Sequence, residues 1–153
     1  MHTLELILAE HAFFKGLEPR YMQLITGCAS NVRFDARTYI FREGEAAEQF
    51  YLIREGKVAL ETFAAERGSI VIETIEAGEV LGWSWLFPPY QWHFSARVVE
   101  PTRAIALDGV CLRNKCEEDH DLGYQLVKRV AQIMMQRLQA TRLQLLDVYS
   151  FRA

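Results

Sequence analysis

The sequence has little of what marks a secreted, membrane-spanning or DNA-coating protein. It contains only three cysteines at irregular spacing, so we expect no disulfide framework and a reducing, cytoplasmic location. Its 17 basic residues are outnumbered by 20 acidic ones, and the formal net charge of -3 argues against a generally basic nucleic-acid surface. The first residues lack the charged region of a signal peptide, and no stretch is apolar enough to predict a membrane span.

What is present predicts a single domain, over residues 1–153, with three parts. Half of the residues are apolar, which is enough to bury a core. Residues 4–30 and 109–150 have apolar positions at helical spacing. Residues 32–108 instead contain short β-rich runs separated by glycines. The predicted fold is mainly β with flanking α, a jelly roll (double-stranded β-helix) with a long C-terminal helix.

Two of the β-rich runs predict a hairpin. Val58 and Leu60 alternate with their neighbours along the chain, and Ile70 and Ile72 repeat the alternation beyond Gly68. Side chains of a strand point alternately to its two faces, so this pattern predicts an antiparallel pair with one buried face.

A long helix is predicted between residues 122 and 148. Acidic residues at 117–121 lie where a helix N-terminus favours negative charge. At roughly 40 Å, the helix would extend beyond one small sandwich, so we expect it to form a parallel homodimer. The alternative is a helix packed on its own domain. The heptad positions of the predicted seam are Val127, Ala131, Met134, Leu138, Thr141, Leu145 and Val148.

All three tryptophans fall within ten residues, in an aromatic segment over 82–95. Gly78 and Gly82 precede the rings, and Pro88-Pro89 stops any helix that begins at Gly82. Rings of this size must bury against the core, a partner or a small molecule. Two interpretations stay open. The rings line a pocket for a flat or apolar ligand, or they fill the core and leave a ligand-free dimerisation or docking module.

Four segments resemble the cyclic-nucleotide-binding domains of catabolite-activator-like regulators, kinase regulatory subunits and gated channels. They are 14–17 (FKGL), 41–45 (FREGE), 50–58 (FYLIREGKV) and 78–82 (GEVLG). The resemblance covers nearly the whole chain. It implies the jelly-roll fold, and it implies that residues 82–95 correspond to the phosphate-binding cassette of that family. A signal would then pass from this cassette to the long helix.

The cassette departs from the family pattern at the ligand. Trp83 stands where the resemblance implies a glutamate for the ribose, and Trp92 or His93 stands where it implies an arginine for the cyclic phosphate. No arginine occurs between Gly68 and Arg97. A buried phosphate without a guanidinium partner loses a strong bidentate contact, so we predict that the ligand is not conventionally bound cyclic AMP.

The candidate pocket combines the cassette with the long helix. The resemblance implies that Thr141 contacts a base across the dimer, although a polar residue that fixes helix register is equally consistent. A true cyclic-nucleotide site would need His93 or Arg142 as its anion contact. The candidate residues are Gly82, Trp83, Ser84, Trp85, Trp92, His93, Phe94, Ser95, Thr141 and Arg142.

The sequence favours a regulator rather than an enzyme or a metalloprotein. Ser84, His93 and Asp108 are the residue types of a catalytic triad, but nothing in their spacing demands one. Cys116 and His120 are too few for a zinc site. The chain ends without a helix-turn-helix, so we expect a stand-alone module that signals through a protein partner, without direct DNA binding. No cofactor is predicted with certainty.

Overall fold

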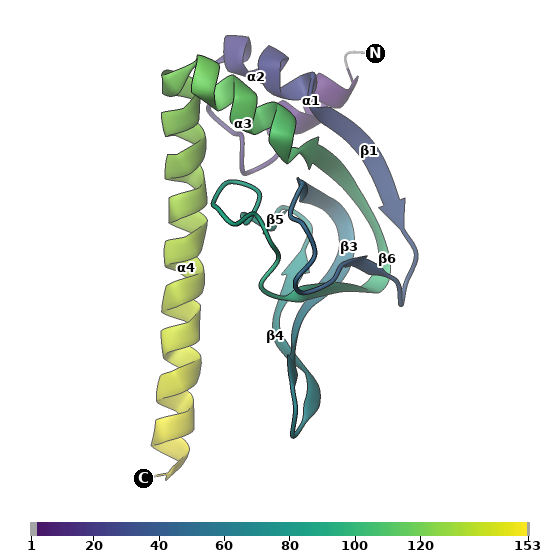
Figure 1. Cartoon of the computed structure of the whole chain (residues 1–153), viewed down its shortest axis with the longest axis vertical. Helices are drawn as coiled ribbons and strands as arrows, with labels where there is room; N and C mark the ends of the chain where they lie inside the picture. The colour runs from purple at the N-terminus through teal and green to yellow at the C-terminus, as the bar shows by residue number, and fades with distance from the viewer. Residues whose placement is uncertain (1–2, 153) are drawn as a thin grey trace.

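The computed structural model of the chain describes residues 3–152 (Figure 1). The architecture is mainly antiparallel β-sheet with flanking helices and a long C-terminal helix, which confirms the predicted fold class. In chain order, the elements are α1 (Thr3–Glu10), α2 (Pro19–Thr26), β1 (Ala29–Phe34), β2 (Tyr39–Phe41), β3 (Gln49–Ala64), β4 (Gly68–Glu76), β5 (Val80–Leu81), β6 (Ser95–Asp108), α3 (Gly109–Glu118) and α4 (His120–Arg152).

The long strands β3 and β6 form the centre of the sheet. The strand order is β1–β6–β3–β4, with β2 also pairing with β6 and β5 with β3, and every pair is antiparallel. The register of β3 and β6 runs from Gln49 opposite Asp108 to Glu61 opposite Ser95. This one pairing therefore spans the sheet from the N-terminal helices to the cassette.

The hairpin is confirmed, but its predicted burial pattern is wrong. Val58, Ala59 and Leu60 are all buried, so β3 is covered on both faces rather than one. β4 is the edge strand, and there Ile72 is exposed and Ile70 only half-buried. An apolar alternation shows which side chains share a face, but not whether another element covers that face.

The core consists of two clusters of buried side chains. One lies between the helices and the sheet and includes Phe50, on which the Trp85 ring stacks at 4.7 Å between centroids. The other lies among the strands and includes Phe41, on which the Trp92 ring stacks at 3.7 Å. Two of the three tryptophans thus belong to the core.

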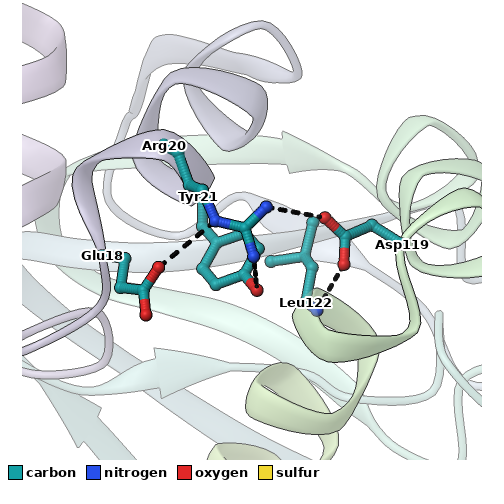
Figure 2. A network of polar contacts seen from close by, with 5 residues as sticks. All are labelled: Glu18, Arg20, Tyr21, Asp119 and Leu122. Atoms are coloured by element: carbon teal, nitrogen blue, oxygen red, sulfur yellow. Dashed lines mark hydrogen bonds and ion pairs between the residues drawn. The ribbon is translucent and has the colours of Figure 1, made fainter.

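Arg20 joins α2 to the start of α4 (Figure 2). Its guanidinium lies 3.2 Å from a carboxylate oxygen of Glu18 and 3.5 Å from one of Asp119, and it donates to the Tyr21 hydroxyl. The other Asp119 oxygen accepts from the Leu122 backbone N–H at 3.1 Å, which caps the first turn of α4. The network therefore ties the beginning of the long helix to the N-terminal helices.

Only the first part of α4 packs on the domain. Leu122, Leu126 and Val130 are buried, whereas the side chains from 131 to 150 are exposed apart from the half-buried Ile133 and Arg137. Figure 1 shows the helix continuing in the same direction as far as the tip of the β3–β4 hairpin. Within residues 3–152, no helix has the length and apolar character needed to cross a membrane.

The cysteines correct the expectation that no disulfide forms. Cys28 and Cys111 are joined by a disulfide across 83 residues of sequence, and Cys116 is free. The disulfide follows from the arrangement of the sheet, because Ala29 at the start of β1 lies opposite Leu107 at the end of β6 and so brings the two cysteines together. The Asp108 N–H also donates to the Cys28 carbonyl at 2.9 Å. Irregular spacing along the chain could not reveal this proximity.

The disulfide closes a loop that contains most of the sheet, so its loss should destabilise the fold. For a loop of this length, the chain-entropy model gives about 4.5 kcal/mol. We expect Cys28→Ser or a reducing agent to lower the urea midpoint clearly. Cys116→Ser is the matched control and should change it little. Equal urea midpoints for the wild-type chain, Cys28→Ser and Cys116→Ser would contradict a stabilising role for this disulfide.

A second prediction concerns Gly82, which has a φ of +94° and lies against Trp92. A Cβ at this position would lie 2.5 Å from the Trp92 ring, whereas a Cβ at Gly44, with φ +89°, would meet nothing within 4 Å. Alanine should be strained at both sites, but only Gly82→Ala should also displace the ring. We expect Gly82→Ala to lower the free energy of unfolding by about 2 kcal/mol more than Gly44→Ala. Equal losses in urea titrations would contradict this packing.

Candidate ligand pocket

The cassette, residues 82–95, connects β5 to β6 and is held against the segment before β3. The Trp92 carbonyl accepts from the Gly44 N–H at 2.8 Å, and the Trp92 N–H donates to the Glu45 carbonyl at 2.9 Å. The Ala47 N–H donates to the Tyr90 carbonyl at 2.7 Å. These backbone bonds fix the second half of the cassette as firmly as a strand pairing would.

The three tryptophans have different environments. Trp85 and Trp92 are almost fully buried and stack on core phenylalanines. Trp83 is half-buried, and its ring lies beneath the guanidinium of Arg137, 4.7 Å from the ring centroid. Of the three rings, only that of Trp83 borders open space beside the cassette.

This space is a pocket of about 500 Å³ between the cassette, the β3–β4 hairpin and α4. Its walls are mostly apolar, with Glu73 and Arg137 as the charged groups. We call it the cassette pocket. Its lining residues are Leu60, Ile72, Glu73, Trp83, Phe94, Met134, Met135, Arg137, Leu138 and Thr141.

Arg137 is the polar centre of the cassette pocket. Its Nη2 donates to the Val80 carbonyl at 2.7 Å, and its Nε lies 3.4 Å from a Glu73 carboxylate oxygen. Its Nη1 is buried without a hydrogen-bond partner in the described part of the chain. A buried donor of this kind is costly unless something accepts from it, so Arg137 is the group best able to orient a ligand.

Burial shifts the pKa of both charged groups in the cassette pocket, Arg137 and Glu73. Desolvation lowers the pKa of Arg137, although the carboxylates of Glu73 and Glu79 oppose that shift. Desolvation also raises the pKa of Glu73, against the opposing effect of Arg137. In both cases burial outweighs the partner's charge, as expected for a pair removed from water.

Sequence reasoning missed Arg137 and Glu73 as pocket residues. Arg137 lies one helical turn before Thr141, whose hydroxyl donates to the Arg137 carbonyl at 2.9 Å. The spacing of four residues on a predicted helix was the available signal for Arg137, because it puts both side chains on one face. Glu73 offered no such signal, because the alternation of Ile70 and Ile72 does not distinguish it from other polar residues of the strand.

The remaining candidate residues lie in different surroundings, and only some of them line the cassette pocket. Phe94 and Thr141 line the cassette pocket with Trp83, whereas Ser84 is buried behind it. The Ser95 hydroxyl accepts from the Glu43 N–H at 2.9 Å. His93 and Arg142 are exposed to solvent and are not part of the pocket lining.

The residues considered for catalysis or metal binding have structural surroundings. The Asp108 carboxylate accepts from the Cys111 N–H at 3.0 Å and caps α3. Burial raises the pKa of the Cys116 thiol to about 11, which leaves it protonated and unreactive near neutral pH. Between residues 3 and 152, no group of three potential metal ligands lies together.

The predicted seam of α4 is exposed along its whole length. Met134, Leu138 and Thr141 border the cassette pocket as well. The exposed seam residues are Val127, Ala131, Met134, Leu138, Thr141, Leu145 and Val148.

Comparison with curated proteins yields no significant match, but many solved structures are similar. A putative cyclic nucleotide-binding protein from Geobacter metallireducens is 28% identical, with a TM-score of 0.80, and the alignment covers 88% of this chain and 97% of that one. The sensor domain of the transcriptional regulator DNR from Pseudomonas aeruginosa is 20% identical, with a TM-score of 0.72 and coverage of 91% and 95%. The catabolite activator protein of Thermus thermophilus is 24% identical, with a TM-score of 0.70 and coverage of 92% and 63%.

The family comparison agrees with the fold. The model of the cyclic nucleotide-binding domain matches residues 31–119, which is more than half of the chain and includes most of β1, the other five strands and the cassette. All of α4 lies beyond the match. The chain belongs to the cyclic nucleotide-binding domain family.

Proposed function

We propose that this chain is a regulatory sensor domain that binds a small ligand other than conventional cyclic AMP in the cassette pocket. The observation that carries the proposal is the position of Arg137, which reaches from α4 onto the Trp83 ring and keeps a buried, unpaired donor. The family membership supports a regulatory rather than a catalytic role. We accordingly propose no enzymatic activity.

The charge of the pocket argues against a cyclic phosphate. Arg137 is paired with Glu73, so the two charges in the pocket largely cancel. The cassette itself supplies no arginine, and Trp83 occupies the position expected for a ribose-binding glutamate. A phosphate would be desolvated there without a free guanidinium.

The same geometry indicates the chemistry of the ligand. Trp83, Phe94 and Leu138 offer flat and apolar surfaces, and Met134 and Met135 supply flexible thioether side chains. One acceptor group on the ligand would satisfy Arg137 Nη1. We therefore propose a largely apolar molecule with a single hydrogen-bond acceptor at one end.

Signalling would run through α4. Met134, Leu138 and Thr141 belong both to the pocket wall and to the exposed seam, so a ligand would contact the helix that a second subunit covers. We propose a parallel homodimer along this seam, read by a protein partner. A ligand would change the signal only by binding two helix arrangements with different affinity.

Two alternatives are supported by particular observations. The stacking of Trp85 and Trp92 in the core favours a docking module without a ligand. A genuine cyclic-nucleotide binder would require His93 or Arg142 to turn inward from solvent.

The expectation of a cytoplasmic location rested partly on the absence of a disulfide framework, and the Cys28–Cys111 disulfide removes that support.

Ligand specificity can be tested by calorimetry and fluorescence. We expect cyclic AMP and cyclic GMP to bind at least about 100-fold more weakly than a micromolar site, because a bidentate phosphate contact is absent. A fractionated pool of cell metabolites should instead contain a component that shifts the tryptophan emission. Trp83 is the reporter, since the other two indoles are enclosed by the core.

Trp83→Phe is the matched control for this measurement. It should abolish the emission change while leaving the circular dichroism spectrum intact. Micromolar binding of either cyclic nucleotide would contradict the proposed specificity. If no fraction shifts the emission, the docking module is the better description.

The dimer can be tested separately with two leucines of α4. Leu145 lies on the seam and outside the cassette pocket, whereas Leu143 lies roughly on the opposite side of the helix. Both side chains are exposed in the single chain, at 54% and 64%. Leu145→Asp should weaken association by at least about tenfold, and Leu143→Asp should not, because only the first places a charge in the apolar seam.

Sedimentation equilibrium provides the measurement. A wild-type chain that stays monomeric at tens of micromolar would contradict the dimer. Equal effects of the two substitutions would place the interface elsewhere on the helix.

A further inference from the structure

A second pocket lies on the other side of α4 from the seam. It has a volume of about 250 Å³ and is enclosed by the segment after α1, the β4–β5 turn and α4. We call it the helix pocket. It contains no residue of the cassette, and its lining includes Phe13, Glu79, Arg129, Gln132, Gln136 and Arg137.

Two arginines that line the helix pocket have unmet hydrogen-bond donors. Arg129 Nη1 donates to Gln125 at 3.3 Å, Nη2 donates to the Lys15 carbonyl at 3.1 Å, and Nε is buried without a partner. Arg137 contributes its unpaired Nη1. Within residues 3–152, three buried side-chain nitrogens lack a partner, and two of them belong to this pocket. Buried donors are nearly always satisfied, so this coincidence points to a missing acceptor.

The charges of the helix pocket favour an anion. Within the described chain, no carboxylate lies within ion-pair distance of Arg129, so its positive charge is uncompensated. The Glu79 carboxylate also lines the pocket and keeps its negative charge, which acts on Arg137, while one of its oxygens accepts from the Glu76 N–H at 2.9 Å. Gln132 and Gln136 add neutral amide donors from the same helix.

The helix pocket stays open when the seam is covered. At 3.6 residues per turn, positions 129, 132, 133 and 136 lie roughly opposite positions 127, 131, 134 and 138. A second subunit on the seam would therefore leave this face free. The volume suits a small metabolite rather than a nucleotide or a drug-sized molecule.

We propose that the helix pocket binds a small oxyanion with two or more negative charges, a phosphorylated or polycarboxylate metabolite. Arg129 would supply the uncompensated positive charge, and Arg137, whose charge is paired with Glu73, would add only the hydrogen bond of its unpartnered Nη1. Arg137 also lines the cassette pocket. An anion that accepts from Arg137 Nη1 in the helix pocket would therefore take that donor away from a ligand in the cassette pocket. By linkage, occupancy of either pocket then alters affinity for the other.

Nitrogen–proton correlation spectra of the wild-type chain test the proposal directly, with pyrophosphate and citrate as separate probes. We expect one or both to shift the Arg129 Nε–H signal saturably, and the probe that acts distinguishes a phosphate from a carboxylate ligand. The Trp83 indole signal reports on the cassette pocket. Failure of the proposed sensor function would leave the Arg129 result unaffected.

Two charge-matched variants complete the experiment. Arg129→Gln should weaken binding of the active probe about tenfold or more, since a charge-assisted contact is lost. Lys128→Gln removes the same charge from the neighbouring, exposed position outside the pocket and should leave binding unchanged. The proposal is overturned if neither probe moves the Arg129 signal saturably by about 10 mM, or if both variants weaken binding equally.

Discussion

The antiparallel pairing of β3 with β6 is the constraint on which the rest of the structure depends. It carries β4 and β5 on one side and β1 and β2 on the other, and its ends hold the cassette and α3. The Cys28–Cys111 disulfide exists because β1 pairs with β6 at this same end. A shift of the β3–β6 register by one residue would exchange side chains between the two core clusters, because successive residues of each strand belong to different clusters.

The cassette combines the fold of the family with an unusually aromatic segment. Gly82 turns the chain at a positive φ, and the Trp92 ring lies where any larger residue at that position would place its Cβ. Trp85 and Trp92 supply packing to two different core clusters, and Trp83 is left at the pocket. The aromatic segment therefore stabilises the domain through Trp85 and Trp92 and lines the proposed site through Trp83.

Arg137 connects the parts of the molecule that a sensor would need to couple. Its side chain reaches from α4 to β4, to β5 and to the cassette through Glu73, the Val80 carbonyl and the Trp83 ring. It is also shared between two pockets on different sides of the helix. If the proposed ligands bind, this single partly satisfied guanidinium would be the group through which occupancy of either pocket acts on α4.

The sequence alone determined the succession of N-terminal helices, β-rich runs and C-terminal helices, the hairpin across Gly68, the long C-terminal helix and the family resemblance. These features are local, because apolar periodicity and turn-forming glycines depend on only a few neighbouring residues. The tertiary structure alone decided that Cys28 meets Cys111, that Ile72 is exposed, and that two tryptophans are core and one borders a pocket. It also decided that Arg137 pairs with Glu73. Each of these depends on which distant segment covers a given face, and no local pattern in one chain specifies that.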